Sequence, residues 1–82
     1  MLGWGINWGP VARTALLNMP WNHAERVDAA VLRYAATGKG DTSKVAEERF
    51  GVWLRASGYV VRLRLYPASR TVGVLYMFRA GT

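Results

Sequence analysis

The sequence predicts an α+β domain in which two helices pack on one face of a largely antiparallel sheet. Three patterns of apolar residues support this fold class: alternation with period two near the N-terminus, helical spacing over residues 10–37, and alternation again over residues 52–79. The predicted order is an N-terminal strand, two helices and a three-stranded antiparallel meander. The 82 residues are enough for one domain, 1–82.

The first strand is expected over residues 3–8, because Trp4, Ile6 and Trp8 alternate with small or polar residues. Gly9-Pro10 then breaks the strand, and proline is well suited to the first position of a helix. The apolar residues of this short helix have helical spacing and are Ala12, Ala15, Leu16 and Met19. Pro20 is expected to end the helix.

The second helix has the clearest pattern. Asn22 and Glu25 have the spacing of a capping box, which places Asn22 at the N-terminal cap. Its apolar stripe consists of Val27, Ala30, Val31, Tyr34 and Ala35. Gly38 is suited to end it. The polar segment TGKGDTSK that follows is expected to be a loop, and residues 44–50 are a candidate for one further helical turn.

The remaining residues predict three strands joined by two turns. The strands are expected at residues 52–56, 59–66 and 71–79. Ser57-Gly58 has the composition of a two-residue hairpin turn, and the segment PASR forms the second turn.

Alternate residues of a strand share one face, so the strand 59–66 presents two different sets. The set expected to pack on the helices is Tyr59, Val61, Leu63 and Leu65. The other set, Val60, Arg62, Arg64 and Tyr66, is expected to face solvent or a ligand, because burial of an unpaired arginine is very costly. Across the hairpin, Trp53 and Arg55 are expected near Val60 and Arg62. The predicted open face shows Arg55, Arg62, Arg64, Trp53 and Tyr66.

The net charge of +6 is concentrated in the last part of the chain. Residues 1–49 carry six basic and five acidic side chains, a balance of +1, whereas residues 50–82 carry five arginines and no acid, a balance of +5. This distribution favours a polyanionic partner, either nucleic acid or an acidic protein segment. Arginines on a solvated strand are also ordinary, but a face kept only for solubility usually mixes both signs.

Several other classes of site are disfavoured. The chain has no cysteine and one histidine, so we expect no disulfide, metal or cofactor site. We expect neither a membrane span nor a secretory signal, and therefore a cytoplasmic protein. His23, Glu47 and Glu48 are possible proton-transfer groups, although each is more simply explained as a surface residue.

Two segments, VWLRASGYVVRLRLY and TVGVLYMFRAG, resemble the core of the RelE/ParE superfamily of bacterial toxin–antitoxin toxins. The shared features are Leu54-Arg55, a short turn, Gly58-Tyr59 and an arginine that closes the last strand, here Arg79. The segment ARTALLNMPW is similar to the first helix of that family, and the resemblance extends over about residues 4–80.

The resemblance implies a small basic toxin that a cognate antitoxin neutralises. RelE-type toxins enter the ribosome and cut messenger RNA, with the RNA 2′-hydroxyl as nucleophile and cationic side chains stabilising the charge that develops. On this comparison Arg55, Arg62 and Arg79 are the candidate catalytic residues. Arg64, Trp53 and Tyr66 are the candidate RNA contacts. ParE-type toxins inhibit DNA gyrase without enzymatic activity.

Some positions depart from the ribonuclease type, which has lysines where Gly51 and Trp53 stand and an arginine at Val60. Its tyrosine in the C-terminal tail has no counterpart in this sequence. Arg62 lies on the same strand face as Val60, about 7 Å further along at about 3.4 Å per residue, and is the candidate replacement. Proton transfer would fall to Tyr66, Tyr76 or His23. A RelE-like ribonuclease is preferred, and the alternatives are a ParE-like gyrase inhibitor or a catalytically weakened homologue that binds RNA or antitoxin.

Overall fold

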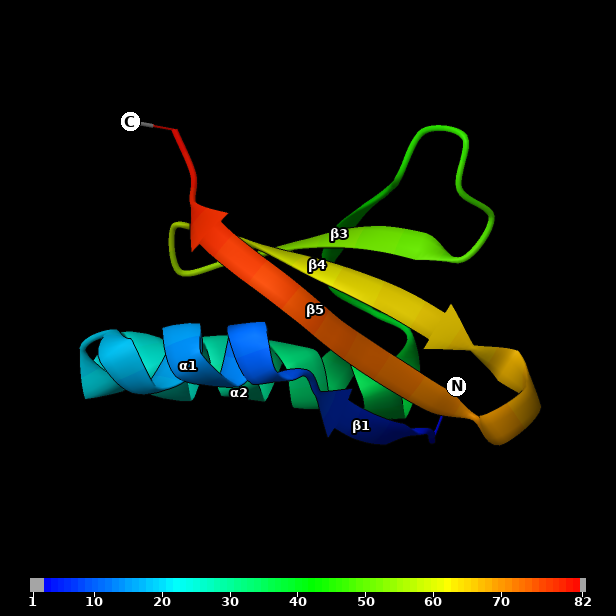
Figure 1. The fold of residues 1–82 in the computed structure, drawn as a ribbon, viewed down its shortest axis with the longest axis horizontal. Helices are drawn as coiled ribbons and strands as arrows, with labels where there is room; N and C mark the ends of the chain where they lie inside the picture. Colours follow the sequence, from blue (N-terminus) through cyan, green and yellow to red (C-terminus); the bar gives the residue numbers. More distant parts are fainter. Residues whose placement is uncertain (1–2, 82) are drawn as a thin grey trace.

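Both helices lie on one face of a five-stranded sheet (Figure 1), in a computed structural model that describes residues 3–81. In chain order the elements are β1 (Gly5–Trp8), α1 (Pro10–Asn18), α2 (Trp21–Thr37), β2 (Asp41–Lys44), β3 (Gly51–Ala56), β4 (Tyr59–Tyr66), a 3-10 turn (Pro67–Ser69) and β5 (Thr71–Arg79). The strand order is β1-β5-β4-β3-β2. β1 pairs with β5 in parallel, and the other neighbours are antiparallel. The predicted fold class is confirmed.

Proline and glycine residues mark the ends of the two helices better than the predicted polar cap does. Pro10 begins α1 as predicted. Pro20 is the N-terminal cap of α2, and its carbonyl accepts the backbone N–H of Ala24 at 2.9 Å. The prediction that Asn22 caps α2 is therefore wrong, because the helix has already begun one residue earlier. Gly38 ends α2 as predicted, with a φ of 76° that favours glycine.

The segment between α2 and β3 differs most from the prediction. Asp41–Lys44, expected to be part of a loop, forms the edge strand β2, in which Thr42 lies opposite Leu54 of β3. Residues 45–50 form turns rather than the candidate helical turn. β2 has no alternating apolar residues, so its pattern does not identify it as a strand. It forms because its backbone pairs with the otherwise open edge of β3.

The hydrophobic core fills the space between the helices and the sheet. The helix-facing set of β4 is confirmed: Tyr59, Val61 and Leu63 are buried, and Leu65 is partly buried against them. The stripe of α2 meets this set through Val27, Val31, Tyr34 and Ala35, all buried. The turn at Ser57-Gly58 has positive φ at both residues, as a tight hairpin turn requires. The core thus leaves the other face of β3, β4 and β5 free of helices.

Burial also makes stability depend on pH through Tyr34, because desolvation raises the pKa of its hydroxyl above the usual value of 10.0. As the pH rises above that value, the unfolded chain loses a proton that the folded chain retains. The free energy of unfolding should therefore fall in this range, and Tyr34→Phe should make the fall shallower. Urea unfolding at a series of alkaline pH values measures the effect, with Tyr66→Phe at an exposed position as control. An unchanged pH dependence in Tyr34→Phe would contradict it.

Candidate functional site on the outer sheet face

The outer face is the side of β3, β4 and β5 that is turned away from the helices. Its side chains are Trp53, Arg55, Val60, Arg62, Arg64, Tyr66, Tyr76 and Phe78. The strand register places Trp53 and Tyr76 on either side of Arg62. Five of the six predicted site residues lie on this face, namely Arg55, Arg62, Arg64, Trp53 and Tyr66.

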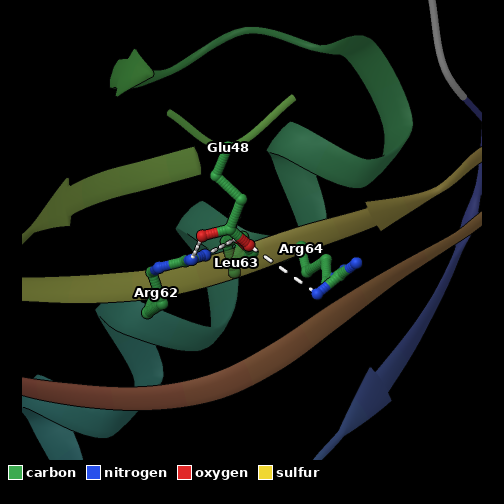
Figure 2. A network of polar contacts seen from close by, with 4 residues as sticks. All are labelled: Glu48, Arg62, Leu63 and Arg64. Atoms are coloured by element: carbon green, nitrogen blue, oxygen red, sulfur yellow. Dashed lines mark hydrogen bonds and ion pairs between the residues drawn. The ribbon is translucent and has the colours of Figure 1, made fainter. Parts of the chain in front are cut away.

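Arg62 is on the predicted face but is not open to solvent, since only 7% of its surface is exposed. Its Nη2 atom donates to Oε2 of Glu48, and its Nη1 atom donates to the Leu63 carbonyl at 2.9 Å (Figure 2). The guanidinium carbon also lies 5.4 Å from the centroid of the Trp53 ring. The expectation of an open Arg62 is corrected: residues 45–50 fold back over the outer face and cover it.

Glu48 joins two arginines of the outer face (Figure 2). Besides its contact with Arg62, its Oε1 atom lies 3.7 Å from Nη1 of Arg64. The Glu48 side chain is 31% exposed and that of Arg64 is 48% exposed. Glu48 was expected to charge the loop surface, but in the structure it supplies the negative charge that residues 50–82 lack.

The segment 45–50 lies close to the sheet because residue 51 is glycine. A Cβ atom at Gly51 would lie 2.9 Å from the Val45 Cβ and 3.1 Å from Nη1 of Arg62, distances that need one of them to shift. The segment is tied to the sheet by the Phe50 carbonyl, which accepts the Leu65 N–H at 2.8 Å. Its turn is closed by a longer hydrogen bond of 3.3 Å from the Glu48 N–H to the Val45 carbonyl.

The other two arginines of the outer face are exposed. The guanidinium of Arg64 lies 5.8 Å from the centroid of the Tyr66 ring. Arg55 reaches the edge strand, where its Nη1 atom is 3.6 Å from Oδ1 of Asp41 and its Nη2 atom donates to Oγ of Ser43 at 3.4 Å. Exposed ion pairs of this kind contribute only about 0–1 kcal/mol, so a phosphate group can replace the carboxylate at little cost.

An aromatic cluster lies beside these arginines. Trp53 packs edge to face against Tyr76 and Phe78, with ring centroids 6.3 and 6.0 Å apart. Tyr76 and Phe78 are both exposed. The sequence predicts Tyr76 only as a proton-transfer candidate and does not single out Phe78. Their spacing of two residues on β5 is the signal that would have placed them on one face.

Arg79 lies apart from the other predicted site residues. It is opposite Tyr59 in the register of β4 and β5, and therefore belongs to the helix-facing set. Its guanidinium carbon is 5.7 Å from the centroid of the Tyr59 ring. On the same side, Nδ1 of His23 lies 3.3 Å from the Tyr59 hydroxyl. The structure thus does not bring Arg79 or His23 together with Arg62.

Apart from Arg62, which residues 45–50 cover, the arginines of the outer face are open to solvent. Residues 3–81 form no detectable pocket, and no group of three or more metal-ligating side chains occurs among them. Within the same residues, no helix combines the length and the apolar character needed to cross a membrane. A face with spaced arginines and aromatics and no enclosed pocket among residues 3–81 suits an extended ligand better than a small enclosed one.

The fold is that of the RelE toxins. The isolated RelE toxin of E. coli superimposes with a TM-score of 0.83 at 11% identity, covering 96% of this chain and 86% of that one. The RelBE2 toxin–antitoxin complex of Mycobacterium tuberculosis gives 0.70 at 18% identity, covering 100% and 97%. The archaeal RelE–RelB complex of Pyrococcus horikoshii gives 0.70 at 19% identity, covering 96% and 97%. No protein-family model and no curated protein matches the sequence.

Proposed function

We propose that this protein is the toxin of a type II toxin–antitoxin module and inhibits translation by cutting messenger RNA on the ribosome. The observation that carries the proposal is the outer face. Three guanidinium groups, from Arg55, Arg62 and Arg64, lie there beside an aromatic cluster, on a fold shared with the RelE toxins. Arginine suits phosphate groups, and an exposed aromatic ring suits an unstacked base.

In the proposed reaction, the RNA 2′-oxygen attacks the adjacent phosphorus. The bond from phosphorus to the 5′-oxygen breaks, which leaves a 2′,3′-cyclic phosphate and a 5′-hydroxyl. The 2′-hydroxyl loses its proton to a base, and the leaving 5′-oxygen gains one. Arg55, Arg62 and Arg64 would stabilise the negative charge on the phosphorus oxygens. Of the proton-transfer candidates, Tyr66 and Tyr76 lie on the outer face and Glu48 contacts Arg62 there, whereas His23 lies on the helix-facing side.

A cognate antitoxin is the second proposed partner. The solved structures with this fold from Mycobacterium tuberculosis and Pyrococcus horikoshii are toxin–antitoxin complexes. A net charge of +6 favours a partner segment that carries acidic residues. With ribosomes and antitoxin as partners, the protein would act in the cytoplasm.

A non-enzymatic gyrase inhibitor is the second candidate function. It is favoured by the position of Arg79, which lies on the helix-facing side and cannot share one phosphate with Arg62 across the sheet. Inhibition by binding alone needs no assembled set of catalytic arginines. A catalytically weakened homologue that binds RNA or antitoxin would fit the same observation.

Purified protein added to a cell-free translation reaction is expected to arrest translation and to create new messenger 5′ ends. Arg64→Ala should reduce the cleavage rate about tenfold or more, because a hydrogen bond to a charged group contributes about 1.5–3 kcal/mol. Arg33→Ala is the matched control, since it removes the same charge from an exposed position on α2.

Intact messenger in the presence of ribosomes and wild-type protein would contradict the ribonuclease proposal. Loss of gyrase supercoiling activity with the same preparation would then support the second candidate. Absence of both effects, together with harmless expression in cells that lack an antitoxin, would indicate the weakened homologue.

A further inference from the structure

We propose that Arg62 and Arg64 form a phosphate-binding site that Glu48 occupies in the free protein. On binding, a phosphate group of the polyanion takes the place of the Glu48 carboxylate between the two guanidinium groups. This inference rests on the proposed function in one respect, namely that the ligand of the outer face is a polyanion.

The geometry of the Glu48 carboxylate is that of a bridging oxyanion. One oxygen accepts from Nη2 of Arg62, and the other lies 3.7 Å from Nη1 of Arg64 (Figure 2). A phosphate group also offers two or more oxygens that accept hydrogen bonds from guanidinium groups. The same pair of arginines can therefore hold either group.

Arg62 requires an anion at this position. A guanidinium carries a positive charge, and only 7% of Arg62 is exposed. Its other contacts, the Leu63 carbonyl and the Trp53 ring, are uncharged groups. A carboxylate that leaves must therefore be replaced by another anion, so a neutral ligand is rejected and a phosphate is selected.

Glu48, rather than Arg62, is the partner able to move. Arg62 projects from β4, the central strand of the sheet, and is fixed by a hydrogen bond of 2.9 Å to the Leu63 carbonyl. Glu48 projects from the turn segment between β2 and β3, where its own N–H forms a hydrogen bond of 3.3 Å. Movement of the Glu48 side chain away from the sheet would expose the guanidinium of Arg62, while the Phe50 carbonyl keeps its hydrogen bond to the Leu65 N–H.

An internal carboxylate of this kind lowers the apparent affinity for every phosphate ligand, because only the fraction of molecules with Glu48 displaced is competent to bind. The Glu48 carboxylate also makes the site more selective for strongly charged anions, because a ligand with a single weak negative charge cannot displace it effectively. Removing the charge of Glu48 should therefore tighten the binding of phosphate ligands.

The test compares Glu48→Gln with Glu47→Gln, which makes the same charge change at the neighbouring residue. Glu47 is exposed and, within residues 3–81, forms no ion pair. The probe is a labelled single-stranded oligonucleotide with 2′-deoxyribose, which binds but cannot be cut. At constant ionic strength, Glu48→Gln should bind about 3- to 10-fold more tightly than wild type, and Glu47→Gln less than about twofold.

Inorganic phosphate provides a second measurement that does not depend on RNA. Added phosphate should raise the melting temperature of Glu48→Gln more than that of wild type or Glu47→Gln, because the anion fills the vacated position. If Glu48→Gln folds poorly alone, phosphate should restore its folding. Failure of phosphate to do so would overturn the proposal.

Other outcomes are equally decisive. Equally tighter binding by Glu48→Gln and Glu47→Gln would show a general charge effect. Weaker binding by Glu48→Gln would show that Glu48 positions Arg62 for the ligand. Either result would overturn the proposal. The inference and the proposed function can fail separately. Tighter binding by Glu48→Gln, with messenger left intact by the wild-type protein, would contradict only the proposed ribonuclease activity. Cut messenger, with equal binding by Glu48→Gln and wild type, would contradict only this inference.

Discussion

Replacement of Leu63 by alanine is expected to lower the free energy of unfolding by about 2–5 kcal/mol. Leu63 is 0% exposed and lies on β4, the central strand, between the sheet and the helices. The substitution removes buried methyl groups and leaves a cavity that the surrounding strands can fill only in part. The loss is large for this chain, since a small domain has a total stability of only about 5–15 kcal/mol.

Leu17→Ala is the matched control for this prediction, because Leu17 is 77% exposed on α1. The chemical change is the same, but the expected loss is within about 0.5 kcal/mol. Both values are measured by urea unfolding at neutral pH. Similar losses in the two variants would mean that Leu63 is not in the core.

Arg62→Ala is expected to destabilise the domain by about 1–3 kcal/mol, whereas Arg64→Ala should cost less than about 1 kcal/mol. Arg62 is buried, and its removal breaks the hydrogen bonds that its guanidinium donates to the Leu63 carbonyl and to one Glu48 oxygen. The expected loss of stability is smaller than for a fully buried ion pair, because the Glu48 side chain is 31% exposed. Arg64 is exposed, and water can replace its longer contact with Glu48.

Urea unfolding without any polyanion measures this difference directly. Each substitution removes one positive charge from the same strand, so a difference in stability reflects burial rather than net charge. Equal stability of the two variants would contradict the buried position of Arg62. The comparison also explains why Arg64→Ala is the better probe of RNA cleavage, since its loss of activity is not confused with unfolding.

Much of the fold follows from local patterns. The alternation along residues 59–66 correctly separates Leu63, which is buried against the helices, from Arg64, which is exposed on the outer face. Pro10 and Gly38 mark helix ends because their backbone preferences hold in any surroundings. The prediction from Asn22 was wrong because a side-chain cap is only one of several ways to begin a helix. Pro20 takes the cap position of α2 instead.

The candidate site was predicted in part. Arg62 and Arg64 share a face because alternate residues of any extended strand do. Arg55 joins them through the pairing of β3 with β4 across the short turn. The aromatic neighbours from β5 depend on how that strand pairs with β4, including a register shift between Arg62 and Leu63. The separation of Arg79 from Arg62 also depends on this register.

By itself the sequence determined which residues share a strand face and where the positive charge lies along the chain. Only the tertiary structure decided that Glu48 covers Arg62, since these residues lie on different elements and meet through the path of the turn between them. That path depends on the pairing of β2 with β3 and on the absence of a side chain at Gly51. The sequence of charges along the chain predicts a basic strand without acidic partners. In the folded protein, Arg62 and Arg64 both contact the Glu48 carboxylate from the preceding segment. The physical reason is that strand alternation is a local property of the backbone, whereas an ion pair across a turn is set by how the chain returns to the sheet.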